Sequence, residues 1–180
     1  VLAVRTLIRF GLAAEPAGCE GVAVMMARLL DEGTQRHTSE EFAGLLERHG
    51  IAFGAGVADG GLMVDVDVSA RHLGAALDLL RQALTEASFP EDEVRRVLRS
   101  RLAEIEQERA SAGHRASREL IATMYAAGER AAIPNAGTAA TIGSLTREDI
   151  AGFHARVVRP QGAVVVLAGD LPGAIRAGVV

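Results

Sequence analysis

The sequence predicts an α+β protein in which an antiparallel sheet is covered by helices. Segments with the pattern of strands, either alternating or continuously apolar, lie near both ends of the chain and as a pair in the middle, whereas helical periodicity fills most of the rest. The resulting order is one strand, two helices, two strands, four helices and a final strand. This order lacks the regular alternation of a doubly wound parallel sheet, and the short turn within the central pair requires antiparallel strands.

The first element is a strand, followed by two helices. Apolar and polar residues alternate between Val4 and Phe10, and a stripe of apolar residues predicts a helix over residues 21–32 that ends at Gly33. Thr38 and Glu41 have the spacing of a capping box. They predict the start of a second helix that runs to His49 and Gly50.

The centre of the chain predicts a hairpin, and the second half predicts helices and a last strand. Residues 51–57 and 62–68 flank the turn 58–61 and form a predicted hairpin whose second strand directs Asp65 and Asp67 to solvent. Amphipathic stretches then predict four helices, over residues 72–84, 91–109, 115–127 and 146–153. A nearly continuous apolar run predicts a last strand over residues 162–168. No change of composition divides the chain, so we expect residues 1–180 to form a single domain. Because it begins on Val1 within a predicted strand, we also expect it to be a fragment of a longer chain.

Composition excludes several classes of protein. The chain has 180 residues, of which 49% are hydrophobic and 23% charged, with a net charge of −4, so we expect a folded domain that binds no nucleic acid. Cys19 is the single cysteine, which rules out an internal disulfide. No apolar run is long enough to predict a membrane span. The compartment stays open between cytoplasm and periplasm.

Residue patterns alone predict no active site. The five histidines are never three to five residues apart, so no helical pair of metal ligands exists. Neither a serine-nucleophile motif nor a phosphate-binding glycine loop occurs. The acidic residues around Glu104 alternate with arginines, a pattern that predicts a solvated helix face with ion pairs between successive turns.

A family resemblance changes this interpretation. Residues 21–34, GVAVMMARLLDEGT, resemble the first helix of the insulinase and pitrilysin zinc peptidases, which include the mitochondrial processing peptidase and carry the inverted zinc motif H-x-x-E-H there. Further segments resemble the family in the same order along nearly the whole chain; they are residues 38–50, the hairpin, residues 76–80, residues 89–93 and residues 164–170. The resemblance implies an α/β roll, in agreement with the predicted order of elements.

The residues that carry the chemistry of this family are missing. The two zinc-binding histidines fall on Val24 and Arg28, and the glutamate that activates water falls on Ala27. The third ligand, a downstream glutamate, falls on Glu104, in an alignment whose register is not fixed. Because a catalytic zinc needs about three protein ligands, the resemblance implies a domain without metal and without peptidase activity of its own.

The resemblance also implies partners. Such peptidases are built from two homologous halves, and this chain resembles the half without metal, so we expect a zinc-bearing half, fused or separate, or a second copy, and a peptide substrate. Some relatives contact the substrate from the region of residues 62–73, which makes Met63 and His72 candidate substrate-binding residues. Two alternatives stay open: a scaffold subunit in a larger complex, or a weak metallopeptidase with dispersed ligands such as His72, His114 and Glu104.

Overall fold

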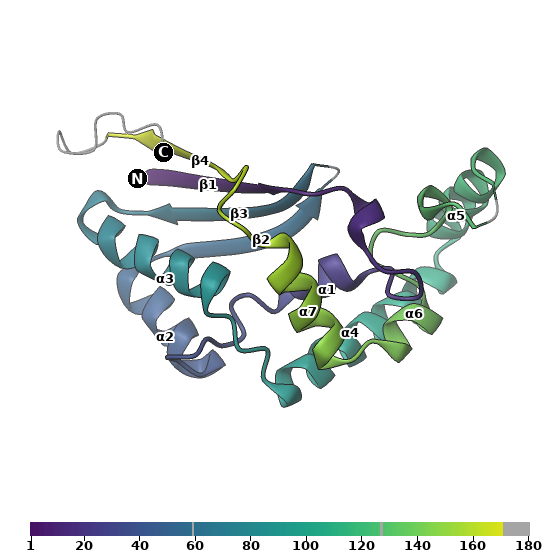
Figure 1. Cartoon of the computed structure of the whole chain (residues 1–180), viewed down its shortest axis with the longest axis horizontal. Helices are drawn as coiled ribbons and strands as arrows, with labels where there is room; N and C mark the ends of the chain where they lie inside the picture. Colours follow the sequence, from purple (N-terminus) through teal and green to yellow (C-terminus); the bar gives the residue numbers. More distant parts are fainter. Residues whose placement is uncertain (59, 127, 171–180) are drawn as a thin grey trace.

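A computed structural model describes residues 1–58, 60–126 and 128–170, and its centre is an antiparallel sheet (Figure 1). The strands are β1 (Leu2–Arg9), β2 (Ala52–Ala58), β3 (Gly61–Val68) and β4 (Val164–Gly169), in the spatial order β2-β3-β1-β4. Every neighbouring pair is antiparallel. The N-terminal strand therefore lies inside the sheet, between the hairpin and the last strand.

Helices cover one face of this sheet, and α5 extends away from it at the right of Figure 1. The α-helices are α1 (Val22–Arg28), α2 (Ser39–His49), α3 (Leu73–Thr85), α4 (Glu91–Ala110), α5 (Ala112–Met124), α6 (Ala139–Ser144) and α7 (Arg147–Val157). Short 3-10 helices are η1 (Leu12–Ala14), η2 (Ala70–His72) and η3 (Arg130–Ala132). The predicted α+β fold, a helix-covered antiparallel sheet, is confirmed.

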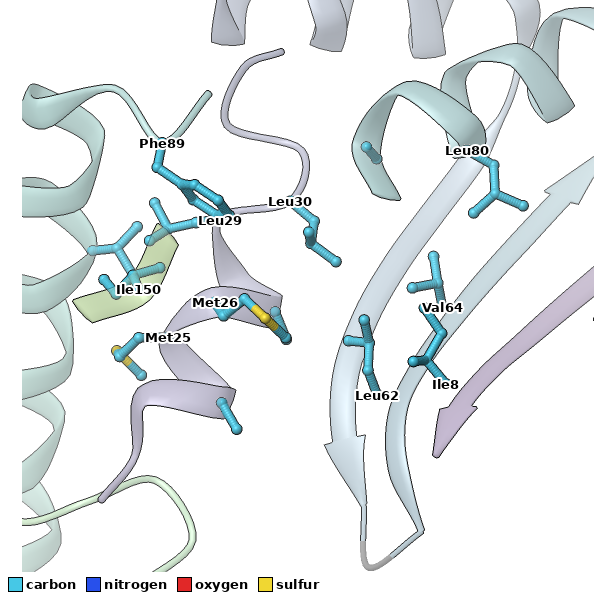
Figure 2. Packing of buried hydrophobic residues seen from close by; sticks show 14 of the residues in the cluster. Ile8, Met25, Met26, Leu29, Leu30, Leu62, Val64, Leu80, Phe89 and Ile150 are labelled. Atoms are coloured by element: carbon cyan, nitrogen blue, oxygen red, sulfur yellow. The ribbon is translucent and has the colours of Figure 1, made fainter. Parts of the chain in front are cut away.

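The core lies between α1 and the sheet, and α1 is buried on almost every side. Figure 2 shows Met26 and Leu30 directed towards the sheet, in which Leu62 of β3 is fully buried, whereas Met25 and Leu29 point towards Ile150 of α7. A short helix that is apolar on several faces is typical of a central position in the core. This position fixes α1 relative to both the sheet and the surrounding helices.

The opposite face of the sheet is polar at its centre. Arg5 of β1 is directly opposite Asp65 of β3, and its guanidinium binds both Asp65 and Asp67, with nitrogen–oxygen distances of 3.1 and 2.9 Å. The side chains of both aspartates remain about half exposed. The solvated face predicted for the hairpin is therefore present.

Two predicted helix boundaries differ clearly from the structure. The first helix ends at Arg28, not at residue 32. Leu29 and Leu30 continue as a turn and are both fully buried, so tertiary packing outweighs helix propensity here. Gly33 has a positive φ of 125° but forms a bridge to Thr38. The helix predicted over 115–127 begins at Ala112, because the Ser111 hydroxyl caps its N-terminus. Asp59 in the hairpin turn and Ala127 lie outside the described residues.

One helix was not predicted from the sequence. Helix α6 occupies residues 139–144 and follows a capping box in which Thr138 and Thr141 exchange hydrogen bonds. Its Ile142 is buried, but six residues are too few to show helical periodicity in a sequence. None of the described helices is long and apolar enough to cross a membrane.

Candidate functional site

Helix α1 is held in place by a buried carboxylate. The side chain of Glu15 has no exposed surface, and its Oε1 accepts hydrogen bonds from the backbone N–H groups of Gly21 and Ala23 at 3.1 and 3.0 Å. Its Oε2 accepts from Arg130, at 2.9 Å from Nε. A carboxylate at the N-terminus of a helix accepts hydrogen bonds from the free N–H groups there and interacts favourably with the positive end of the helix dipole. The first turn of α1 is thus anchored to a segment more than a hundred residues away.

The residues at the positions of the zinc motif lie on adjacent turns of α1. Val24 is half-buried against the core, Ala27 is buried, and Arg28 is half-buried with 37% of its side chain exposed. Residues three and four positions apart share one face of a helix. Val24 and Arg28 therefore lie on the same side of α1.

Arg28 and Glu104 form a bidentate ion pair. The two terminal nitrogens of the guanidinium donate to Oε1 and Oε2 of Glu104 at 2.7 and 3.0 Å, across 76 residues of sequence. This geometry matches the planar guanidinium to the planar carboxylate. The structure thus brings the residues at two of the three expected metal-ligand positions into direct contact.

A second arginine extends the pair into a network. Arg101 has only 5% of its side chain exposed; it donates to Glu104 at 3.1 Å and to both carboxylate oxygens of Glu108 at 2.6 and 3.1 Å. Its Nε donates to the carbonyl oxygen of Ala136 at 3.1 Å. Arg28 of α1 and Glu104, Arg101 and Glu108 of α4 therefore form a network in which positive and negative charges alternate.

The arginines stabilise the charged form of both glutamates. Hydrogen bonds from Arg28, and then from Arg101, hold the pKa of Glu104 below its ordinary value of 4.5. The hydrogen bonds from Arg101 likewise lower the pKa of Glu108. Both carboxylates are ionised at neutral pH and fully engaged by cations.

These residues do not fit a zinc ion. Val24 has no donor atom, Arg28 carries a permanent positive charge where a dication would bind, and both oxygens of Glu104 accept hydrogen bonds from Arg28. Within residues 1–58, 60–126 and 128–170, no three His, Cys, Asp or Glu side chains are close enough to hold a metal ion. In particular, the structure does not gather His72, His114 and Glu104.

Met63 and His72 do not share a site. Met63 lies near the start of β3 with 39% of its surface exposed, beside a shallow pocket of about 370 Å³ that Gly54, Gly56 and Asp65 also line. His72 follows the other end of β3, and its ring packs against His49 at a centroid distance of 5.0 Å. Five residues of strand, about 16 Å, separate Met63 from the end of β3.

Sequence reasoning missed the burial of Arg101. The prediction placed the charged residues of α4 on a solvated face, but Arg101 shares a helical stripe with the buried residues Val94, Val97 and Ile105. That spacing of three and four residues was the available signal. No sequence pattern predicted the ion pair between Glu15 and Arg130, because 115 residues separate the two positions.

Comparison with known proteins identifies the family. The sequence profile of the insulinase peptidases, peptidase family M16, matches residues 2–136, three quarters of the chain. The chain belongs to the insulinase family. The resemblance inferred from the first helix is thereby confirmed.

Individual proteins are similar to the chain in sequence or in fold. A Helicobacter pylori protein described as "Non-peptidase homolog YmxG" is 26% identical over 153 residues, which are 84% of this chain and 35% of that protein. The crystal structure of a peptidase M16 inactive domain from Pseudomonas fluorescens superimposes with a TM-score of 0.86 at 24% identity; it covers 96% of this chain and 42% of its own. The periplasmic protease PqqL from Escherichia coli has a TM-score of 0.81 at 17% identity, over 96% of this chain and 20% of its own.

Pitrilysin shares the same fold. Its crystal structure has a TM-score of 0.77 at 19% identity and covers 95% of this chain and 19% of its own. The chain thus spans about a third of the curated relative and less than half of these solved structures.

Proposed function

We propose that the chain is a non-catalytic domain of an insulinase-family peptidase that pairs with a homologous zinc-bearing half and helps to enclose the peptide substrate. The observation that carries this proposal is the Arg28–Glu104 ion pair at the expected metal position. A guanidinium there repels a dication and cannot activate water. Zinc is therefore expected only in the paired half.

The comparisons support this proposal in two ways. Two of the relatives carry the descriptions "inactive domain" and "non-peptidase homolog". The solved relatives are also more than twice as long as the matched part, which leaves room in them for a second half.

Strand β2 is the part of this domain best placed to contact a peptide. It is an edge of the sheet, it pairs with β3 alone among the described strands, and α1 packs against it. An extended peptide can add to such an edge through backbone hydrogen bonds, with little dependence on side-chain sequence. Gly54 and Gly56 leave the surface beside this edge open, because no atom lies within 4 Å of a Cβ built at either position.

Reconstitution with the zinc-bearing half tests the proposal. The partner is a homologue with an H-x-x-E-H motif, followed about 76 residues later by a glutamate as in this chain, encoded in the same polypeptide or in an adjacent gene. We expect the 180-residue chain alone to leave a fluorogenic peptide intact, and its addition to raise the activity of the partner at least about tenfold.

A matched control separates the roles of the two halves. Replacing the glutamate of the partner's H-x-x-E-H motif by glutamine should abolish activity in the mixture, because this chain supplies no replacement base. Metal-dependent hydrolysis by the chain alone would contradict the proposal. So would a partner that neither binds the chain nor gains activity from it, and recovery of a partner without any peptidase motif would favour a scaffold role.

A further inference from the structure

Two histidines from different elements lie with their rings in contact, and neither belongs to α1 or α4. His49 is the last residue of α2, and His72 ends the short 3-10 helix η2 that leads from β3 into α3. Their ring centroids are 5.0 Å apart, and the ring planes are tilted by 57°. The tilt excludes a parallel stack, in which the nitrogen lone pairs lie in separate planes and cannot meet. A tilted pair can direct one nitrogen of each ring towards a common ligand.

The ring of His49 carries a polar atom without a partner. Its Nδ1 is buried and forms no hydrogen bond within the described part of the chain. A buried polar atom without a partner is rare in folded proteins, and a bound ion is one of the accepted explanations for it. Imidazole is also the commonest metal ligand among protein side chains. The pair thus combines an unsatisfied nitrogen with a second imidazole at close range.

The separation of the two rings matches that of two imidazoles on one metal ion. Metal–imidazole bonds of about 2.0–2.1 Å place each ring centre roughly 3 Å from the ion, so two rings in adjacent coordination positions have centres about 4.5–5 Å apart. The observed 5.0 Å lies at the upper end of this range. Little movement of α2 or η2 is therefore needed for both rings to reach the same ion.

The end of α2 provides a favourable field for a cation. His49 lies at the C-terminus of this helix, where the helix dipole is negative. Arg48 and Arg71 are its neighbours and those of His72 in sequence, but both are exposed, so water and salt screen their charges. Arg48 also lines a separate pocket together with Glu40 and Glu41. The two arginines therefore oppose a bound cation only weakly.

We propose that His49 and His72 bind one divalent copper or nickel ion and thereby join the end of α2 to the segment between β3 and α3. Within residues 1–58, 60–126 and 128–170, no group of three His, Cys, Asp or Glu side chains can hold a metal, so water completes the coordination. Cu²⁺ and Ni²⁺ accept planar or tetragonal sites of nitrogen and oxygen, whereas zinc sites in proteins commonly have three or four protein ligands. The inference goes beyond the proposed function, because neither a peptide nor a zinc-bearing half takes part.

Calorimetric titration of the purified 180-residue chain with nickel chloride tests this site. Ni²⁺ is the probe because, unlike Cu²⁺, it does not readily oxidise the free thiol of Cys19. We expect about one Ni²⁺ per chain, with an affinity that His49→Gln or His72→Gln lowers at least about tenfold. The double variant should bind within about threefold of either single variant, because the loss of one ring already removes the shared ion.

His114→Gln is the matched control. His114 is exposed on α5, so this variant should bind Ni²⁺ like the parent chain. Circular dichroism without metal checks that each variant remains folded. Equal weakening by His114→Gln, or an unchanged affinity in both His49→Gln and His72→Gln, would assign the ion to scattered surface histidines and overturn the proposal.

Proton NMR of the parent chain tests the same pair without any substitution. Because Ni²⁺ is paramagnetic, a small amount of it should broaden the ring signals of two of the five histidines before those of the others. A nuclear Overhauser effect between these two rings, recorded without metal, identifies them as the pair 5.0 Å apart. Uniform broadening of all five, or a chain that binds no Ni²⁺ up to about 1 mM, would overturn the proposal.

Discussion

At the scale of single residues, two arginines bind the same carboxylate from different environments. Arg28 reaches Glu104 with 37% of its side chain exposed, whereas Arg101 reaches it with 5% exposed. Exposed ion pairs contribute little to stability because water and salt screen them, but the loss of a buried partner leaves an unpaired charge. The two arginines should therefore differ strongly in their importance for folding.

Replacement of each arginine by methionine measures this difference. Arg101→Met leaves Glu104 and Glu108 without their shared cation and should lower the free energy of unfolding by roughly 2 kcal/mol, less than for a fully buried pair because both glutamates are about one third exposed. Arg28→Met should lower it by about 1 kcal/mol or less. Urea denaturation of both variants gives these values. Equal losses would show that Arg101 does not hold the network together.

The glutamates of the network should make the fold sensitive to acid. The pKa values of Glu104 and Glu108 are lower in the folded protein than their ordinary value of 4.5, so folding is favoured while they are ionised. Their contribution is fully present above about pH 5 and is lost as the pH falls below 4.5 through the folded pKa values. The double variant Glu104→Gln, Glu108→Gln should lose less stability than the parent between pH 5 and pH 3, as urea titrations at each pH can show. An equally steep loss would contradict this assignment.

At the scale of elements, local signals explain the helices whose ends face solvent. Thr38 accepts a hydrogen bond from the N–H of Glu41, and Glu41 accepts one from the N–H of Thr38, as the capping-box spacing predicts. Gly50 ends the same helix with a φ of +59°. Helix ends of this kind depend on residues three or four positions apart, so they can be predicted from the sequence.

Removal of the capping hydroxyl tests the contribution of this local signal. Thr38→Ala should lower the free energy of unfolding by about 1 kcal/mol, because the N–H of Glu41 loses its acceptor. Thr38→Ser keeps the hydroxyl and should remain within about 0.5 kcal/mol of the parent. Chemical denaturation gives the free energy of unfolding of both variants. If Thr38→Ala and Thr38→Ser lower it by similar amounts, the hydroxyl of Thr38 does not act as a helix cap.

At the scale of the whole molecule, the fold brings together two of the positions where the family resemblance predicts metal ligands. Helix α1 presents positions 24 and 28 on one side, and α4 brings Glu104 into contact with position 28. Tertiary structure alone creates this proximity, because 76 residues separate the two positions. The arrangement should therefore accept a metal once suitable ligands are supplied.

The double variant Val24→His, Arg28→His tests this expectation. With Glu104 it supplies three zinc ligands, so the purified variant should retain about one zinc per chain after dialysis, measured by mass spectrometry of the metal. Adding Glu104→Ala should weaken zinc binding at least about tenfold. Val24→His alone is the control and should retain none. A folded double variant without zinc would show that the geometry has diverged from that of the family.

The candidate site was predictable only in part. The positions of Val24, Ala27, Arg28 and Glu104 came from the family resemblance, and the structure shows that Arg28 and Glu104 touch. The ion pair between Glu104 and the buried Arg101 was not predicted, because the mixture of acidic residues and arginines on α4 indicated a solvated face. The roles of Met63 and His72 in substrate binding remain predictions.

The sequence by itself determined the class of fold, the central hairpin and the caps of α2. These properties depend on residue identity and on spacings of two to four residues, which the chain carries along its length. Tertiary structure alone decided that α1 ends at Arg28, that Glu15 is anchored by Arg130 and that Arg28 is neutralised by Glu104. These contacts join distant segments, and their energies depend on burial, which exists only once the chain has folded.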